Sequence, residues 1–168
     1  MAVTSPPSVN AVDYPQAHQL EIYWLGIERT SLAPLKRLHI GTETVWQSEY
    51  HYLHRTGFRD LDDLLKRIFD KDPKRSYILY KFLMDMRQNL LEVRRVLKPS
   101  RRYVIVLGDT RIRGAAVQTW KYLSEIAQQV GYTAEHTFGT EVLSRDEGHS
   151  RRRKSGIERV LVLRNVKD

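Results

Sequence analysis

The sequence predicts an α/β fold in which helices cover a sheet, and three observations carry that prediction. Residues 103–107 form a continuous apolar run rich in β-branched residues, which is typical of a strand buried on both faces. Before this run lies a long amphipathic helix that ends at Pro99, and after it lies a second helix over residues 117–130. Two further strands, over 133–142 and 158–163, could form an antiparallel pair joined by a basic loop.

The remaining elements are shorter. Residues 2–4 would form a strand that Pro6 and Pro7 stop, because proline cannot continue a hydrogen-bonded ladder. Apolar spacing predicts helices over 14–25 and 61–69, whereas either a helix or loop packing fits 28–58. In the long helix, which we expect to begin at Tyr77, steps of three and four residues place on one face Leu83, Met86, Leu90, Val93 and Leu97.

Length and composition favour one domain over residues 1–168. The chain is 41% hydrophobic, which suffices for a core, and it contains no glycine-rich or proline-rich linker. It contains no cysteine, which excludes disulfides and a cysteine nucleophile. Without a signal peptide or an apolar stretch long enough to cross a bilayer, we expect a soluble, cytoplasmic protein that does not contact a membrane.

The charge of +8 is concentrated in the second half of the chain. Such clusters suit a polyanion such as DNA, although a solvated basic surface explains them equally well. The basic run in the loop between the last two strands is a candidate DNA contact, with a solvated hairpin tip as the alternative. The candidate DNA-binding residues are Arg111, Arg113, Arg151, Arg152, Arg153 and Lys154.

The chain opens with Thr4-Ser5-Pro6-Pro7. This motif resembles the signature of DNA methyltransferases that modify the amino groups of cytosine-N4 or adenine-N6, which is a Ser, Asp or Asn followed by two prolines and an aromatic residue. Residues 92–106 resemble the helix-to-strand passage of class I methyltransferases, with Ser100-Arg101 where two glycines often stand. The resemblance implies a partial Rossmann-like fold: the half with strands 4–7, covering helices and a C-terminal antiparallel pair.

The resemblance also assigns roles. An exocyclic amino nitrogen is a poor nucleophile, so the enzyme must align it with the methyl group and polarise its hydrogens. The Ser5 hydroxyl and the Pro6 carbonyl would accept those hydrogens, with Pro7 stiffening the loop. Methyl transfer would come from S-adenosylmethionine, with Thr4 and Asp109 as candidate contacts for this co-substrate. An acidic residue after a strand is also a common turn or cap, which is the alternative for Asp109.

The family pattern is broken after the second proline. Ser8 occupies the place of the aromatic residue on which the flipped base stacks, and stacking is worth roughly 1–3 kcal/mol. Tyr14 is a possible substitute, with helix packing as the alternative. Because Ser heads the motif, the resemblance favours cytosine-N4 over adenine-N6. A catalytically degenerate subunit for DNA binding or assembly is the leading alternative, and an RNA or protein methyltransferase is a third.

The donor-binding half of the family fold has no counterpart in these residues, since no Phe-x-Gly-x-Gly pattern occurs. We therefore expect a second polypeptide, or a homo-oligomer, to supply what this chain lacks; a truncated derivative is the alternative. Residues 28–76 are the candidate target-recognition insertion. The only histidine pair with close spacing, His51 and His54, has no supporting carboxylates, so no metal site is expected.

Overall fold

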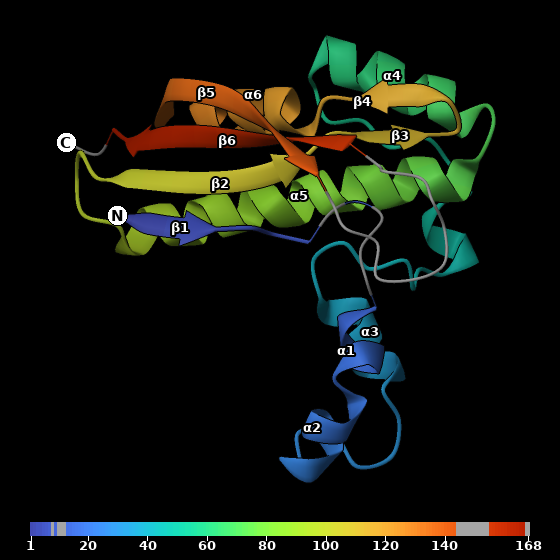
Figure 1. The fold of residues 1–168 in the computed structure, drawn as a ribbon. Helices are drawn as coiled ribbons and strands as arrows, with labels where there is room; N and C mark the ends of the chain where they lie inside the picture. The colour runs from blue at the N-terminus through green and yellow to red at the C-terminus, as the bar shows by residue number, and fades with distance from the viewer. Residues whose placement is uncertain (8, 10–12, 144–154, 167–168) are drawn as a thin grey trace. The chain divides into compact units, whose positions relative to one another are not determined.

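A four-stranded sheet in the computed structural model joins one strand from the start of the chain to three strands from its second half (Figure 1). The structure describes residues 1–7, 9, 13–143 and 155–166. The strands follow the spatial order β1 (Ala2–Thr4), β2 (Arg102–Gly108), β6 (Ser155–Asn165) and β5 (Tyr132–Leu143). β1 runs parallel to β2, whereas β6 is antiparallel to both of its neighbours. The predicted first strand, buried strand and terminal antiparallel pair are therefore confirmed.

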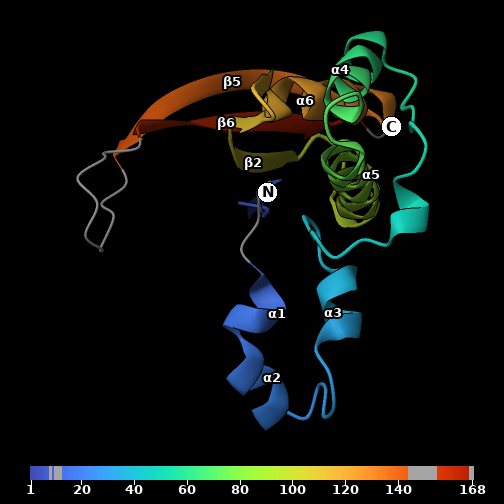
Figure 2. The ribbon, with the colours of Figure 1, turned by 90° about the vertical axis from the view of Figure 1, so that its right-hand side faces the viewer.

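Two helices lie on the same face of this sheet. α5 (Pro73–Val96) precedes β2, and α6 (Thr119–Gln129) connects β2 to β5. β1, β2 and β5 all run in the same direction, and connections between parallel strands are right-handed. Two such connections that advance in the same direction across a sheet place their helices on the same face. Hydrogen bonds fix α5 there, because the Tyr103 hydroxyl lies 2.7 Å from Asn89 Oδ1 and the Asn165 amide donates to the Leu97 carbonyl at 2.9 Å. Figure 2 shows α5 and α6 beside the strands.

The burial of β2 differs between its two faces as a result. Tyr103, Ile105 and Leu107 are buried, whereas Val104 and Val106 on the opposite face are only half-buried. The prediction of a strand buried on both faces is thus confirmed for the face under the helices and wrong for the other. On that other face Val3 of β1, which pairs with Val104, is 62% exposed.

The chain divides into two compact units. The first contains residues 1–6, 86–111 and 116–168, with the sheet, the second half of α5 and α6. The second contains residues 7–85 and 112–115. Each unit contributes part of α5, so the single-domain organisation stays a prediction.

The long helix begins four residues earlier than its apolar pattern predicts. Asp72 caps it, with its carboxylate accepting the Arg75 backbone N–H at 3.0 Å, and Pro73 occupies the first helical position. Leu83, Met86 and Leu90 are completely buried, while Val93 and Leu97 are half-buried. The helix ends at Val96, shortly before Pro99.

The second unit begins with short helices. Residues 14–25 form α1 (Tyr14–Ala17) and α2 (Gln19–Trp24), separated at His18. The helical spacing is confirmed, but it marks no buried face here, since Leu20 is 77% and Trp24 91% exposed. Helices of one or two turns bury little on their own. Residues 28–58 are mostly loop, with α3 (Ala33–Leu38) and the 3₁₀ helix η1 (Gln47–Glu49).

α4 (Arg59–Phe69) matches the amphipathic pattern of residues 61–69. Its apolar side is buried, and the carboxylate of Asp62 anchors the preceding loop by accepting the backbone N–H groups of Thr56 and Gly57 at 2.6 and 3.2 Å. The buried residues of α4 are Leu61, Leu64, Leu65 and Ile68.

A hairpin between β2 and α6 was not expected from the sequence. β3 (Thr110–Ile112) pairs with β4 (Ala115–Val117), and the turn residues Arg113 and Gly114 have φ values of 49° and 85°. Positive φ at both central positions is the type I′ geometry of two-residue hairpins. Arginine rarely adopts a positive φ, and so the sequence does not predict this turn.

No helix in the described part of the chain combines the length and apolar character needed to cross a membrane. Among the same residues, no cluster of three or more His, Asp or Glu side chains is placed to hold a metal ion.

Candidate functional site

The Ser-Pro-Pro segment lies directly after β1, at the carboxyl end of the two parallel strands. Thr4 is level with Ile105 of β2. Extending this register by two residues puts Pro6 level with Leu107, which pairs in turn with Arg159 of β6. Ser5 is exposed, and Pro6 and Pro7 are half-buried. The segment thus presents an accessible hydroxyl at the edge where α/β sheets place their ligands.

Asp109 lies at the same edge, one residue beyond β2. Its Oδ2 is 3.6 Å from Nε of Arg159, and both side chains are about 30% exposed. The guanidinium of Arg159 also lies over the Trp120 ring, 5.4 Å from its centroid. Neighbouring strands are about 4.8 Å apart, and β2 lies between β1 and β6. Arg159 of β6 is therefore separated from Pro6 by two strand spacings, or roughly 10 Å across the sheet. The structure therefore brings Asp109 to the Ser-Pro-Pro edge, together with a cation that the sequence did not single out.

Three donors beside this edge have no hydrogen-bond partner within the described residues: Thr119 Oγ1, Trp120 Nε1 and Arg159 Nε. All three atoms are buried. Nε of Arg159 is slightly too far from the Asp109 carboxylate for a hydrogen bond. A ligand that accepts hydrogen bonds from these donors would therefore remove the free-energy cost of leaving them without an acceptor.

The predicted basic contacts have different surroundings. Arg111 is exposed. Arg113 forms an ion pair with Asp72, with 2.7 Å between Nη2 and Oδ2, and so its charge is compensated. Burial alone would raise the pKa of Asp72, but hydrogen bonds from Arg75 and Arg113 lower it below its ordinary value. Arg151, Arg152, Arg153 and Lys154 lie outside the described residues, as does Ser8.

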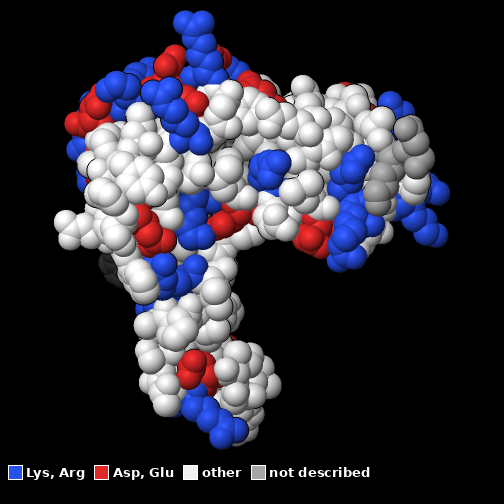
Figure 3. All heavy atoms as spheres, turned by 180° about the vertical axis from the view of Figure 1, so that it is seen from behind, with Lys and Arg blue, Asp and Glu red and all other residues white. Residues whose placement is uncertain are grey.

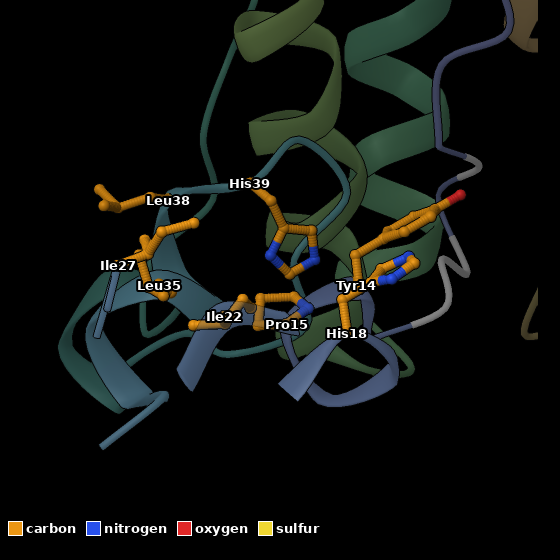
Figure 4. Close-up of a pocket in the computed structure, with 8 residues that line it drawn as sticks. All are labelled: Tyr14, Pro15, His18, Ile22, Ile27, Leu35, Leu38 and His39. Atoms are coloured by element: carbon orange, nitrogen blue, oxygen red, sulfur yellow. The ribbon is translucent and has the colours of Figure 1, made fainter. Parts of the chain in front are cut away.

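Tyr14 belongs to the second unit, where it lines an apolar pocket of about 380 Å³ (Figure 4). The Tyr14 hydroxyl points away from the apolar side chains of the pocket in this view. Its ring lies 6.5 Å from that of His18 and 6.3 Å from that of His39. Tyr14 therefore has packing partners of its own within the second unit.

The surface over α1 to α3 carries few charges, whereas charges of both signs are interspersed elsewhere on the face shown in Figure 3.

His51 and His54, the closely spaced histidine pair, belong to an aromatic cluster. His54 is half-buried, and its Nε2 lies 2.7 Å from the carbonyl of Glu49, while His51 is exposed. The His54 ring is 4.4 Å from Tyr52 and 4.7 Å from Tyr80 of α5. The sequence showed aromatic residues in this region but not that rings 26 residues apart would stack.

No protein-family model matches the chain. The type II methyltransferase M.MvaI of Kocuria varians is 24% identical to it over 148 residues, which cover 82% of this chain and 32% of that protein. The chain thus spans about a third of the length of this relative.

Among solved structures, the chain is similar to a protein of Thermus thermophilus that is described as a DNA modification methylase. Its selenomethionine form matches with a TM-score of 0.41 at 22% identity, over 52% of this chain and 38% of that one. Its complex with S-adenosyl-L-methionine matches with a TM-score of 0.42 at 21% identity, over 54% and 40% of the two chains.

Proposed function

We propose that this chain carries the catalytic motif of a DNA methyltransferase, which transfers a methyl group from S-adenosylmethionine to the exocyclic amino group of a flipped base. One observation carries the proposal: Ser5-Pro6-Pro7 follows β1 at the edge where parallel β2 ends, one residue before Asp109. This is the edge where open α/β sheets bind their substrates. The similarity to a type II methyltransferase supports the same activity.

In this proposal Ser5 and Pro6 act on the amino group of the base. The exposed Ser5 hydroxyl and the Pro6 carbonyl accept its two hydrogens, which keeps the nitrogen lone pair directed out of the ring plane. The two prolines restrict the backbone, so the acceptors are positioned before the base arrives. No covalent enzyme intermediate is needed, which is compatible with a chain that contains no cysteine.

The residues present do not fit S-adenosylmethionine by themselves. Thr4 and Asp109 remain the candidate contacts, but the Asp109 carboxylate already faces Arg159, and no glycine-rich loop occurs in the 168 residues. We propose that a second polypeptide, or another copy of the chain, completes the donor site. In the described residues β1 pairs only with β2, so its second edge can accept a further strand. The four strands would then be strands 4–7 of a class I methyltransferase sheet.

The finer assignments rest on the motif. Serine at its head favours cytosine-N4 over adenine-N6. Arg111 is an exposed candidate for phosphate contact, and the run from Arg151 to Lys154 is a candidate from sequence alone. Arg113 would have to exchange Asp72 for phosphate, which makes it the weaker candidate.

A second function is favoured by Ser8, which replaces the aromatic residue of the family motif. Without that ring the flipped base loses its stacking platform, and the chain would serve as a catalytically degenerate subunit that binds DNA or assembles with a partner. An RNA or protein substrate is a third candidate, because planar nitrogens of other substrates present the same chemistry.

Incorporation of tritiated methyl groups into DNA tests the proposal, with and without a candidate donor-binding subunit. Incorporation that depends on both chains is expected, and Ser5→Ala should lower its rate roughly 100-fold, as removal of one positioned polar group does in other enzymes. Ser31→Ala, a change at another exposed serine, is the matched control. No incorporation under either condition would favour the binding subunit.

Two further measurements separate the alternatives. Ser8→Tyr restores an aromatic residue, and tests on DNA and RNA in parallel would identify the substrate class; an increase of about one or two orders of magnitude on the true substrate is expected. Calorimetry with S-adenosylmethionine should detect no strong binding by the isolated chain. Tight binding would contradict the need for a second chain.

A further inference from the structure

The loop between α3 and α4 carries a ladder of aromatic rings, all within the second unit. The His51 ring lies 4.7 Å from Tyr52, and Tyr52 lies 4.4 Å from His54. His54 in turn contacts two rings of α5, at 4.9 Å from Tyr77 and 4.7 Å from Tyr80. We call residues 46–57 the aromatic loop. Its rings are therefore backed by a long helix whose buried face belongs to the core.

Hydrogen bonds hold the aromatic loop in one conformation. His51 Nδ1 lies 2.6 Å from the Ser48 carbonyl, and His54 Nε2 lies 2.7 Å from the Glu49 carbonyl. At the far end of the loop, Asp62 accepts the Thr56 backbone N–H at 2.6 Å. A loop fixed in this way loses little conformational entropy when a ligand binds.

The outer rings of the loop remain open to solvent. Trp46 is 63% and Tyr52 is 52% exposed. The Arg37 guanidinium lies over Trp46, 4.2 Å from the ring centroid, and Glu49 holds Arg37 with both carboxylate oxygens at 3.2 Å. Glu49 also accepts the Tyr77 hydroxyl at 3.1 Å, which connects Trp46 to the ladder. Large aromatic rings that are both rigid and exposed are typical of recognition surfaces.

The charges around these rings favour a ligand that is flat and negatively charged. From Tyr50 to Arg59, both included, the chain has two arginines and two histidines but no acidic residue. Among the carboxylates around the loop, Glu43 and Glu49 are engaged by Arg75 and Arg37, and Asp62 accepts the backbone N–H groups of Thr56 and Gly57. DNA with unpaired bases combines planar rings with a phosphate backbone, and the histidines and arginines of this stretch suit that combination.

We propose that the aromatic loop is a DNA contact in which Trp46 and Tyr52 stack on unpaired bases, with Arg55 at an adjacent phosphate. This inference rests on the proposed function and names residues within the candidate target-recognition segment 28–76. A ring held by a guanidinium on one side can stack a base on the other, and every base offers a π face. The contact therefore favours unpaired over fully paired DNA and is tolerant of sequence.

Fluorescence of a single tryptophan tests this directly, because the chain has only three, at positions 24, 46 and 120. Trp24→Phe with Trp120→Phe leaves Trp46 as the reporter. A single-stranded oligonucleotide should quench it, and a fully paired duplex should quench it less. The matched control keeps only Trp24, which is 91% exposed but has no cation over its ring among the described residues, and it should not be quenched.

Affinity measured by fluorescence anisotropy supplies the second arm. Trp46→Ala and Tyr52→Ala should each weaken single-strand binding roughly 5- to 150-fold, whereas Trp46→Phe and Tyr52→Phe retain the ring and most of the affinity. Trp24→Ala should leave the affinity unchanged. Comparing the alanine variants with their phenylalanine counterparts, with thermal melts of each, separates loss of stacking from loss of fold.

Four outcomes would overturn the inference. Three of them are equal quenching by heparin, which has charge but no bases, unchanged affinity in the alanine variants, and affinity lost equally in the phenylalanine variants. The fourth is a preference for soluble oligosaccharide or peptide over DNA, which would assign the loop to another partner. None of these measurements needs a methyl donor. Absence of methyl transfer with intact quenching would refute the proposed enzyme and leave the DNA contact standing.

Discussion

Asp109 and Arg159 face each other across the carboxyl end of β2, with 3.6 Å between carboxylate and guanidinium. Arg159 comes from β6, the strand that separates β2 from β5, and its guanidinium lies over Trp120 of α6. A partly exposed pair of this kind contributes little to stability. The candidate edge is thus supported by three elements of the first unit.

A double-mutant cycle measures this pair. Asp109→Asn and Arg159→Gln should each cost less than about 1 kcal/mol of unfolding free energy, with a coupling of roughly 0.2–1 kcal/mol between them. Urea denaturation of the four proteins provides the values. Arg164, which pairs with Glu135 further along β6, serves as the control and should show no coupling to Asp109. Equal coupling in both cycles would exclude a specific contact.

Gly131→Ala should destabilise the protein by about 1–3 kcal/mol, since Gly131 has a φ of 92° that alanine adopts only with strain. An added Cβ would also meet the Arg94 guanidinium at 2.6 Å, although that flexible group can move. Gly108→Ala has open space and no positive φ, and so it should be neutral or stabilising. Thermal melts that rank the two variants in the opposite order would contradict the described turn.

Leu83→Ala should cost roughly 2–5 kcal/mol, because its side chain on α5 is completely buried. Leu20→Ala removes the same atoms from a residue that is 77% exposed and should change stability by no more than about 0.5 kcal/mol. Chemical denaturation of both variants compares the faces directly. A large loss in Leu20→Ala would mean that α2 is covered in solution.

Glu49→Gln should reduce the dependence of stability on acidic pH. Burial alone would raise the pKa of Glu49, but hydrogen bonds from Trp46, Tyr77 and Arg37 lower it below its ordinary value of 4.5. Because the folded pKa is below the unfolded one, the ionised group stabilises the fold above about pH 4.5. This stabilisation is lost as the pH falls through the folded value. Melting temperatures between neutral and acidic pH should therefore fall less in the variant than in the native protein.

The strands and long helices could be predicted because their signals are local. Residues 103–107 and the stepped apolar residues of α5 each occur within one segment, and burial in the structure follows them. The pattern of residues 14–25 is misleading because apolar residues at helical spacing also occur in helices of one or two turns that bury no face. The Asp72 cap lies outside the apolar pattern, so the pattern predicts a start of α5 that is too late.

The candidate site could be predicted only in part. Ser5 and Asp109 stand beside recognisable strand ends, and the order of the strands brings them to one edge. Arg159 and Trp120 could not be found, because their contact depends on β6 entering the sheet beside β2. The stacking of His54 on Tyr80 likewise joins segments whose packing the sequence does not reveal.

The position of β6 has a consequence for how the sheet is made. During synthesis β1, β2 and β5 appear before β6, yet β6 occupies the place between β2 and β5. Until β6 leaves the ribosome, β2 and β5 have no shared partner and α6 has no continuous sheet to cover. Contacts between strands that are far apart in the sequence, such as β2 and β6, form slowly. The first unit must therefore pass through a stage in which unpaired strand edges and apolar surface are open to other chains, so its yield on expression should depend on how quickly β6 is inserted.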